Sequence, residues 1–127
     1  MSSANKVTWL GRGMSALAVL PFLFSMSMKF SANPQMLEGF SHLGWPESMI
    51  MGIAGLELMS VVIYAIPQLS ILGAILLTGY LGGAIATHLR VGESPIVQVF
   101  IGLLVWGGLY FREPRLRAIL PIRKSTG

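Results

Sequence analysis

The sequence predicts an all-α protein, an integral membrane four-helix antiparallel bundle with both termini in the cytoplasm. Of its 127 residues, 54% are hydrophobic and only 11% are charged, whereas a soluble domain carries about 25% charged residues. The apolar residues fall into four segments, each within the ~17–25 residues that cross a bilayer as a helix. We therefore expect a single membrane domain, with spans at residues 9–29, 46–66, 69–88 and 95–111 and a basic tail at residues 112–127.

The first span has the shortest charge-free part, residues 13–28, between Arg12 and Lys29. It can cross the bilayer if both cations lay their apolar stems in the membrane and keep their charged heads at the interfaces. A secretory signal peptide cleaved near Ser31-Ala32 is the alternative interpretation, although Lys29 fits poorly in a cleavage region. After this span, Pro34–Phe40 could form a short amphipathic helix on the membrane surface.

The second and third spans form a helical hairpin around Pro67. Proline lacks a backbone donor and disfavours helix in the residue before it, so we expect a tight turn at residues 66–70. Glu57 is the only charged residue between Glu47 and Arg90, and it lies about 15 Å from either end of its helix at a rise of ~1.5 Å per residue. A charge at that depth costs at least ~2.5 kcal/mol. Glu57 should therefore face other helices or a wet cavity.

The basic residues predict how the chain is oriented. Four spans place both termini on one side of the membrane, and cytoplasmic segments carry an excess of Lys and Arg. Only Lys29 and Arg90 fall on the other side. Seven basic residues fall on the side of the termini: Lys6, Arg12, Arg112, Arg115, Arg117, Arg123 and Lys124. The termini are therefore expected in the cytoplasm.

Four polar residues could meet in the outer half of such a bundle. Lys29 ends an outward-running helix and Glu57 lies on an inward-running one. Helical side chains lean toward the N-terminus of their helix, so these two side chains should converge. His88 and Arg90 end the third span on the same side. We predict a polar pocket with Glu57 as its floor; the alternative is an ion pair or hydrogen bond that only fixes helix packing.

Two further patterns bear on packing and on metal binding. Gly79 and Gly83 form a G-x-x-x-G pair, which allows helices to approach closely. We expect this packing inside the bundle, with a contact between copies of the chain as the alternative. His42 and His88 are not part of the E-x-x-H pairs that bind metals in helical bundles, so we expect no metal site.

Several classes of function are disfavoured by what the sequence lacks. It has no cysteine, which removes thiol catalysis, disulfides and zinc–thiolate sites. It has no G-x-S-x-G nucleophile elbow and no phosphate-binding glycine motif. The net charge of +4 does not indicate nucleic-acid binding, because the cations cluster at the ends of apolar segments.

Several short motifs follow one another along the chain: Lys29, a loop with Pro34, His42-Leu43-Gly44-Trp45-Pro46, Gly55-Leu56-Glu57, Pro67, and Gly79 to His88. In order and spacing they resemble the DoxX-like family over about residues 12–110. The resemblance implies a small four-helix protein of the bacterial inner membrane, with the family's polar positions at Lys29, Glu57 and His88. It also implies redox proteins as partners, since some relatives are membrane subunits of thiosulfate:quinone oxidoreductases and others anchor redox or oxidative-stress complexes.

Three functions fit these expectations. The first is a non-catalytic subunit or scaffold of a redox-associated membrane complex, without a cofactor of its own and with redox or other membrane proteins as partners. The alternative is a subunit that binds a quinone, a lipid or another small ligand around Glu57, because quinones need an apolar slot with a few polar groups. A small transporter ranks last, because four spans without internal repeats are meagre for alternating access unless copies of the chain assemble.

Overall fold

The computed structural model describes residues 3–123, and these residues form helices and turns without a strand, which confirms the all-α prediction. The part of the predicted tail at residues 124–127, with Lys124, lies outside the described residues. The helices are α1 (Ser3–Phe30), α2 (Pro34–His42), α3 (Ile50–Ala65), α4 (Ser70–Arg90), α5 (Ile96–Arg112) and α6 (Pro114–Arg117), and short 3-10 helices η1 (Glu47–Met49) and η2 (Pro67–Leu69) precede α3 and α4.

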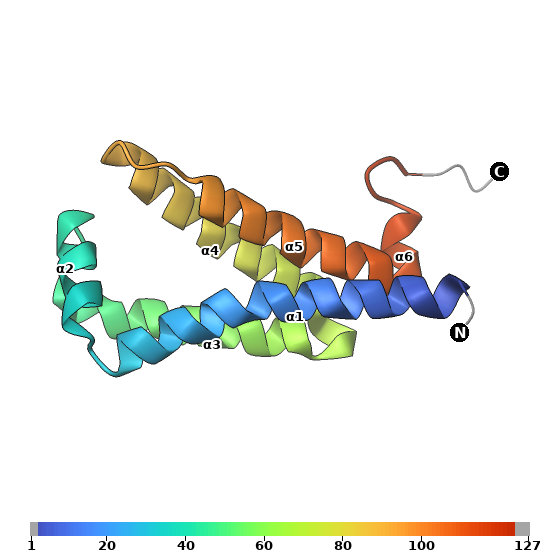
Figure 1. The fold of residues 1–127 in the computed structure, drawn as a ribbon, viewed down its shortest axis with the longest axis horizontal. Helices are drawn as coiled ribbons and strands as arrows, with labels where there is room; N and C mark the ends of the chain where they lie inside the picture. Colours follow the sequence, from blue (N-terminus) through green and yellow to red (C-terminus); the bar gives the residue numbers. More distant parts are fainter. Residues whose placement is uncertain (1–2, 124–127) are drawn as a thin grey trace.

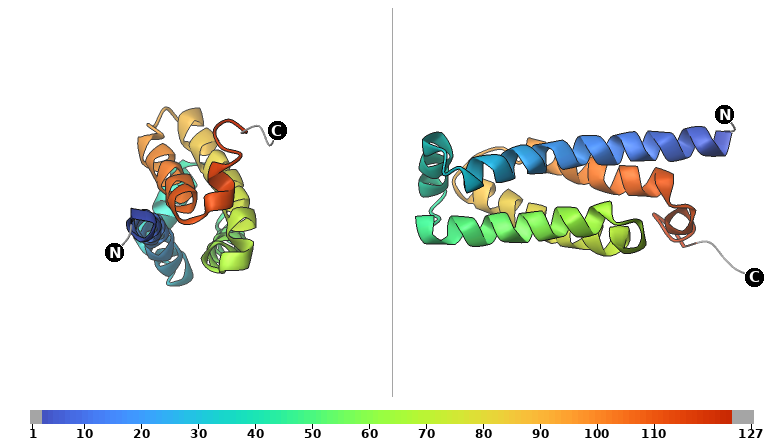
Figure 2. Two further views of the ribbon diagram at one scale, coloured as in Figure 1. Left: turned by 90° about the vertical axis from the view of Figure 1, so that its right-hand side faces the viewer. Right: turned by 90° about the horizontal axis from the view of Figure 1, so that it is seen from below.

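The four longer helices of the described part, α1, α3, α4 and α5, lie along the length of the molecule, and each runs in roughly the opposite direction to the one before it (Figure 1). Helix α1 packs against α5 and α3, and α4 packs against α3 and α5, so that the four share one interior (Figure 2). Helix α2 lies across the end where α1 stops and α3 starts. At that same end, α4 and the beginning of α5 diverge from α1 and α3 (Figure 1).

Three helices of the described part are long and apolar enough to cross a membrane: Asn5–Phe30, Glu47–Ala65 and Pro67–Arg90. Helix α5 is also apolar but has only 17 residues. Large hydrophobic side chains cover the outside of these helices, with Phe24 69% and Ile96 73% exposed. Extensive exposed apolar surface suits contact with lipid better than contact with water. A helix therefore occupies each predicted span, and three of these four helices are both long enough and apolar enough to cross a membrane.

The turn between α3 and α4 lies at Pro67, where the sequence predicts it. Ile66 is extended, with φ −81° and ψ 117°, so α3 ends directly before the proline. The Ser70 hydroxyl donates to the carbonyl oxygens of Tyr64 at 2.9 Å and Ile66 at 3.0 Å, which are groups that a helix end leaves unpaired. A Cβ on Gly73 would lie 2.3 Å from the Cα of Tyr64. Only glycine lets the two helices meet this closely.

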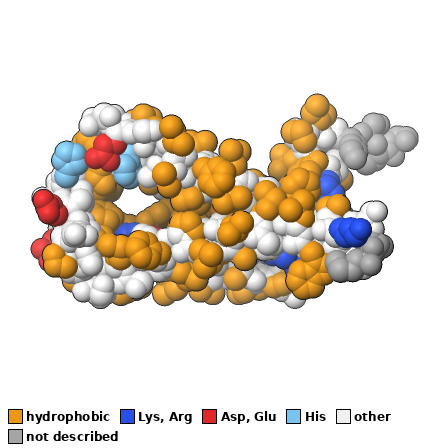
Figure 3. All heavy atoms as spheres, in the orientation of Figure 1, with side chains coloured by type: hydrophobic (Ala, Val, Ile, Leu, Met, Phe, Trp, Pro, Cys, Tyr) orange, Lys and Arg blue, Asp and Glu red, His pale blue; other side chains and the backbone are white. Residues whose placement is uncertain are grey.

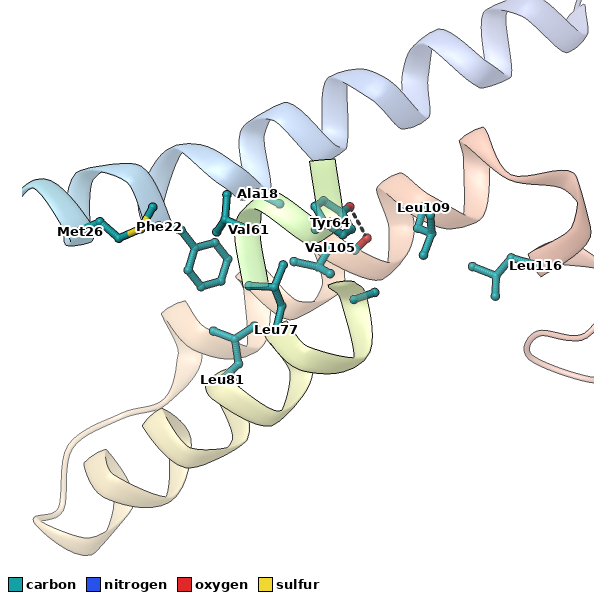
Figure 4. Close-up of a cluster of buried hydrophobic side chains, with 11 residues drawn as sticks. Ala18, Phe22, Met26, Val61, Tyr64, Leu77, Leu81, Val105, Leu109 and Leu116 are labelled. Carbon is teal, nitrogen blue, oxygen red and sulfur yellow. Dashed lines mark hydrogen bonds between the residues drawn. The ribbon is translucent and has the colours of Figure 1, made fainter. Parts of the chain in front are cut away.

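The packed core has a polar centre at Tyr64, whose side chain is 1% exposed. Its hydroxyl donates to the carbonyl oxygen of Val105 at 2.7 Å (Figure 4), and it pairs with the Ser15 hydroxyl at 2.8 Å. These bonds connect α3 to both α5 and α1. The apolar side chains of the same cluster are Ala18, Phe22, Met26, Val61, Ala74, Leu77, Leu81, Val105, Leu109 and Leu116.

Candidate functional site

Lys29 and Glu57 form a buried ion pair between α1 and α3. The Lys29 ammonium nitrogen lies 2.7 Å from Oε2 of Glu57, and the two side chains are 3% and 0% exposed. Lys29 stands in the last turn of α1 and Glu57 in the middle of α3. Each side chain leans toward the N-terminus of its own helix. Burying two charges costs several kcal/mol per ion unless further hydrogen bonds satisfy them, so the neighbours of this pair decide its energy.

Ser25 and Tyr80 supply those further hydrogen bonds. The Tyr80 hydroxyl donates to Oε2 of Glu57 over 2.5 Å, and it accepts from the Lys29 ammonium at 3.2 Å. Lys29 also donates to the Ser25 hydroxyl, which in turn donates to Oε2 of Glu57 at 3.5 Å. The ammonium nitrogen lies 5.5 Å from the ring centre of Phe40, a cation–π contact. Three donors therefore converge on one carboxylate oxygen.

The other carboxylate oxygen of Glu57, Oε1, is buried and has no hydrogen-bond partner among residues 3–123. A buried acceptor without a donor costs about 1–3 kcal/mol, and more when it is charged. The hydrogen bonding of this carboxylate is thus one-sided. Its Oε1 atom is an open acceptor inside the protein.

A cavity of about 540 Å³ adjoins this cluster, which is within the range of small-molecule sites. It lies where α4 and α5 diverge from α1 and α3, and Figure 3 shows a hollow in the same end of the molecule. Its polar lining includes Ser25, Lys29, Glu57 and Tyr80. The apolar lining includes Phe22, Met36, Phe40, Leu43, Trp45, Ile53, Leu56, Leu81 and Ile101. A mainly apolar wall with a few convergent polar groups is typical of a ligand site.

The other two residues of the predicted pocket stand away from the ion pair. His88 lines the cavity, but its Nδ1 pairs with the carbonyl oxygen of Ala84 at 2.7 Å, within its own helix. Arg90 does not line this cavity. It is the last residue of α4, its side chain is exposed, and it donates to the carbonyl oxygen of Leu43. Arg90, which was expected beside the pocket, instead reaches with its side chain over to the loop after α2.

The two histidines share a carboxylate. Nε2 of His42 lies 3.2 Å from Glu93 and Nε2 of His88 lies 3.7 Å from its other oxygen. These contacts connect α2 with the end of α4 and the loop that follows it. Within residues 3–123, no three His, Asp or Glu side chains are placed to hold a metal ion together.

The structure also gives Gly79 and Gly83 a different role from the predicted one. A Cβ at either position would meet nothing within 4 Å, and both residues line the cavity. Close contact between α1 and α5 occurs instead at Gly108, where a Cβ would lie 2.6 Å from the backbone nitrogen of Ser15. Among the residues that the structure describes, α4 therefore makes no close helix contact through this pair, because it diverges from α1 and α3 at this level.

Sequence reasoning missed Ser25 and Tyr80, although each left a signal. Ser25 stands four residues before Lys29, a spacing that places both on one face of a helix. Glu57 stands nine residues before the turn at residues 66–70 and Tyr80 stands ten residues after it. The two arms of a hairpin rise equally per residue, so both side chains reach a similar depth. A search for polar residues at the depth of Glu57 would have found Tyr80.

The chain was compared with known protein families, with curated proteins and with solved structures. A sequence model of the DoxX-like family matches residues 13–108, a region that contains the ion pair, Ser25, Tyr80 and both histidines. No curated protein and no solved structure matches the chain significantly. The family match covers well over half of the chain, and the matched region includes Glu47–Ala65, Pro67–Arg90 and most of Asn5–Phe30, the helices that are long and apolar enough to cross a membrane. The chain therefore belongs to the DoxX-like family and is an integral membrane protein.

Proposed function

We propose that the protein is a non-catalytic subunit of a membrane complex, and that it holds a small amphiphile, foremost a quinone, in the cavity beside Lys29 and Glu57. The observation that carries this proposal is the make-up of the cavity: about 540 Å³ of mainly apolar and aromatic walls around one buried ion pair. A quinone has a matching shape and chemistry, with an apolar body and a few polar oxygens. A lipid headgroup is the other amphiphile that this pocket would suit.

The groups around the cavity suit binding better than catalysis. Lys29 faces Glu57 at 2.7 Å, so it serves as a counter-ion and not as a base for Ser25. Tyr80 already donates to the same carboxylate. The chain has no cysteine, so it brings no thiol for redox chemistry. A redox role would therefore come from a partner protein, which is the basis for proposing a subunit or scaffold.

We place α1, α3, α4 and α5 across the bacterial inner membrane as an antiparallel bundle with cytoplasmic termini. In Figure 3, Lys and Arg side chains gather mainly at one end of the molecule, and His and Glu side chains gather at the opposite end. That separation matches the excess of positive charge on cytoplasmic segments. The 17 residues of α5 reach the lower limit for a span. The cavity would then lie in the outer half of the membrane.

Extraction into a mild detergent, followed by mass spectrometry of the intact assembly, tests this proposal. The wild type should carry a bound quinone or lipid and a stable membrane partner. Ile53→Trp, which narrows the cavity, should lose the amphiphile, because Ile53 lines it. Leu58→Trp is the matched control on the same helix, since Leu58 is exposed and outside the lining.

Two results would contradict the proposal. Equal amounts of bound amphiphile in both tryptophan variants would show that the cavity is not the binding site. A chain that purifies alone under these conditions would argue against a subunit role.

A further inference from the structure

We propose that the cavity binds a planar ring through ring hydroxyl groups, so that it prefers a quinol, the reduced form, over the corresponding quinone. This inference rests on the proposed function and specifies its ligand. It starts from the one-sided hydrogen bonding of Glu57, whose Oε1 is buried, lacks a partner and belongs to a residue that lines the cavity.

The donors of the cluster are already committed. An ammonium group has three N–H donors, and those of Lys29 are directed to Ser25, Glu57 and Tyr80. The single hydroxyl hydrogens of Ser25 and Tyr80 both point to Oε2 of Glu57. The cluster therefore offers the cavity an acceptor and no spare donor. A quinone carbonyl can only accept, so it finds no partner within this cluster and depends on donors elsewhere in the lining, such as the Gln98 amide, whereas a quinol hydroxyl can donate to Oε1.

A second open acceptor lines the same cavity. The side-chain oxygen of Gln98, near the start of α5, is buried and has no hydrogen-bond partner in the part of the chain that the structure describes. It comes from a different helix than Glu57, so the two acceptors are independent features of the lining. A quinol carries two ring hydroxyls, which supply one donor for each. The Gln98 amide also has donor hydrogens, so Glu57 is the stronger determinant of the preference.

The shape of the lining favours a ring. Gly79 and Gly83 leave open space along α4, because a Cβ at either would meet nothing within 4 Å. Aromatic side chains from other segments, Phe22, Phe40 and Trp45, contribute to the same walls. Flat surfaces of this kind suit stacking against an aromatic ring. A glycerolipid offers hydroxyls too, but no flat ring to fill this space.

The test measures binding of a short-chain ubiquinol and of its oxidised form to the detergent-purified full chain under anaerobic conditions. Calorimetry should show the quinol binding at least about 10-fold tighter, which equals 1.4 kcal/mol. Gly83→Leu should weaken both forms, because its side chain would enter the cavity. Gly82→Leu on the same helix is the matched control, since Gly82 is open but does not line the cavity.

Two variants separate the acceptors. Glu57→Gln should abolish most of the preference, although it also weakens the ion pair and so can impair folding. Gln98→Leu leaves the ion pair intact and should reduce quinol affinity several-fold with little change for the quinone.

The outcomes distinguish this inference from the proposed function. Equal or tighter binding of the quinone, with loss in Gly83→Leu, would overturn the quinol preference and leave the binding function standing. A short-chain monoacylglycerol could instead bind to the wild type and be lost in Gly83→Leu, while the quinol does not compete with it. That result would overturn the inference that the ligand is a planar ring and would support a lipid site. Binding of none of the three probes would overturn both proposals.

Discussion

Replacing Lys29 with methionine should destabilise the fold strongly, because Glu57 would stay buried without its counter-ion. The two side chains are 3% and 0% exposed, so water screens their interaction very little. Removing one partner of a buried pair costs about 3–5 kcal/mol. Ser25 and Tyr80 still donate to Glu57 in the variant, so we expect the lower end of that range, ~3 kcal/mol. At 1.4 kcal/mol per factor of ten, that is about a 100-fold larger unfolded fraction.

The double variant Lys29→Met with Glu57→Leu separates the value of the pair from the cost of an orphaned charge. Replacing a buried pair by apolar residues of similar volume is often neutral or stabilising. The double variant should therefore be more stable than Lys29→Met alone. The hydroxyls of Ser25 and Tyr80 lose their acceptor in the double variant, and each buried donor left unpaired costs about 1–3 kcal/mol. The recovery of stability should therefore be partial.

Unfolding by titration with sodium dodecyl sulfate in mixed micelles, followed by circular dichroism, measures both variants. Lys6→Met is the control for loss of a lysine, since Lys6 is exposed near the start of α1. A loss below about 1 kcal/mol in Lys29→Met, the range of a surface pair, would refute the reasoning. So would a double variant that is as unstable as the sum of the two single variants, because the partners would then act independently.

Two more predictions concern packing. Gly73→Ala should cost more than the ~1–3 kcal/mol of ordinary overpacking, because its Cβ would lie 2.3 Å from the Tyr64 backbone. The same titration measures this loss. Its control is Gly82→Ala, at an open position of the same helix, which should be unchanged or slightly stabilised by helix propensity. Tyr64→Phe should cost about 1–3 kcal/mol, since it strands the hydrogen-bonding groups of Ser15 and Val105; a loss of a few tenths would show that these bonds contribute little.

The sequence predicts the hairpin and the ion pair well because both depend on strong local signals. Proline at position 67 cannot continue α3, and the structure ends that helix at Ala65. Lys29 and Glu57 are rare charges within long apolar segments, and the direction in which helical side chains lean is fixed by covalent geometry. A charge inside the membrane is costly unless it is paired. Because the apolar segments hold almost no other charged residue, Lys29 and Glu57 are each other's most available partner.

Local sequence signals could not predict which face of α4 packs against other helices, nor where the side chain of its last residue, Arg90, comes to lie. A G-x-x-x-G pair reports that two positions are small, but it does not report what lies opposite. Gly79 and Gly83 face the cavity because α4 diverges from α1 and α3 at the end of the molecule where α2 lies (Figure 1), and no local pattern in the sequence reports that divergence. The path of the Arg90 side chain likewise depends on where the carbonyl oxygen of Leu43 comes to lie.

The arrangement around Glu57 favours a binding site over a bond that only fixes helix packing. A cluster that served packing alone would be most stable with donors on both carboxylate oxygens and with apolar side chains filling the space around them. Here three donors share Oε2, none reaches Oε1, and two glycines leave the adjoining wall open. Both departures cost stability, and both occur in the lining of the same cavity. A hydroxyl-bearing ring in that cavity would remove both costs at once, since it would fill the space and donate to the open oxygen.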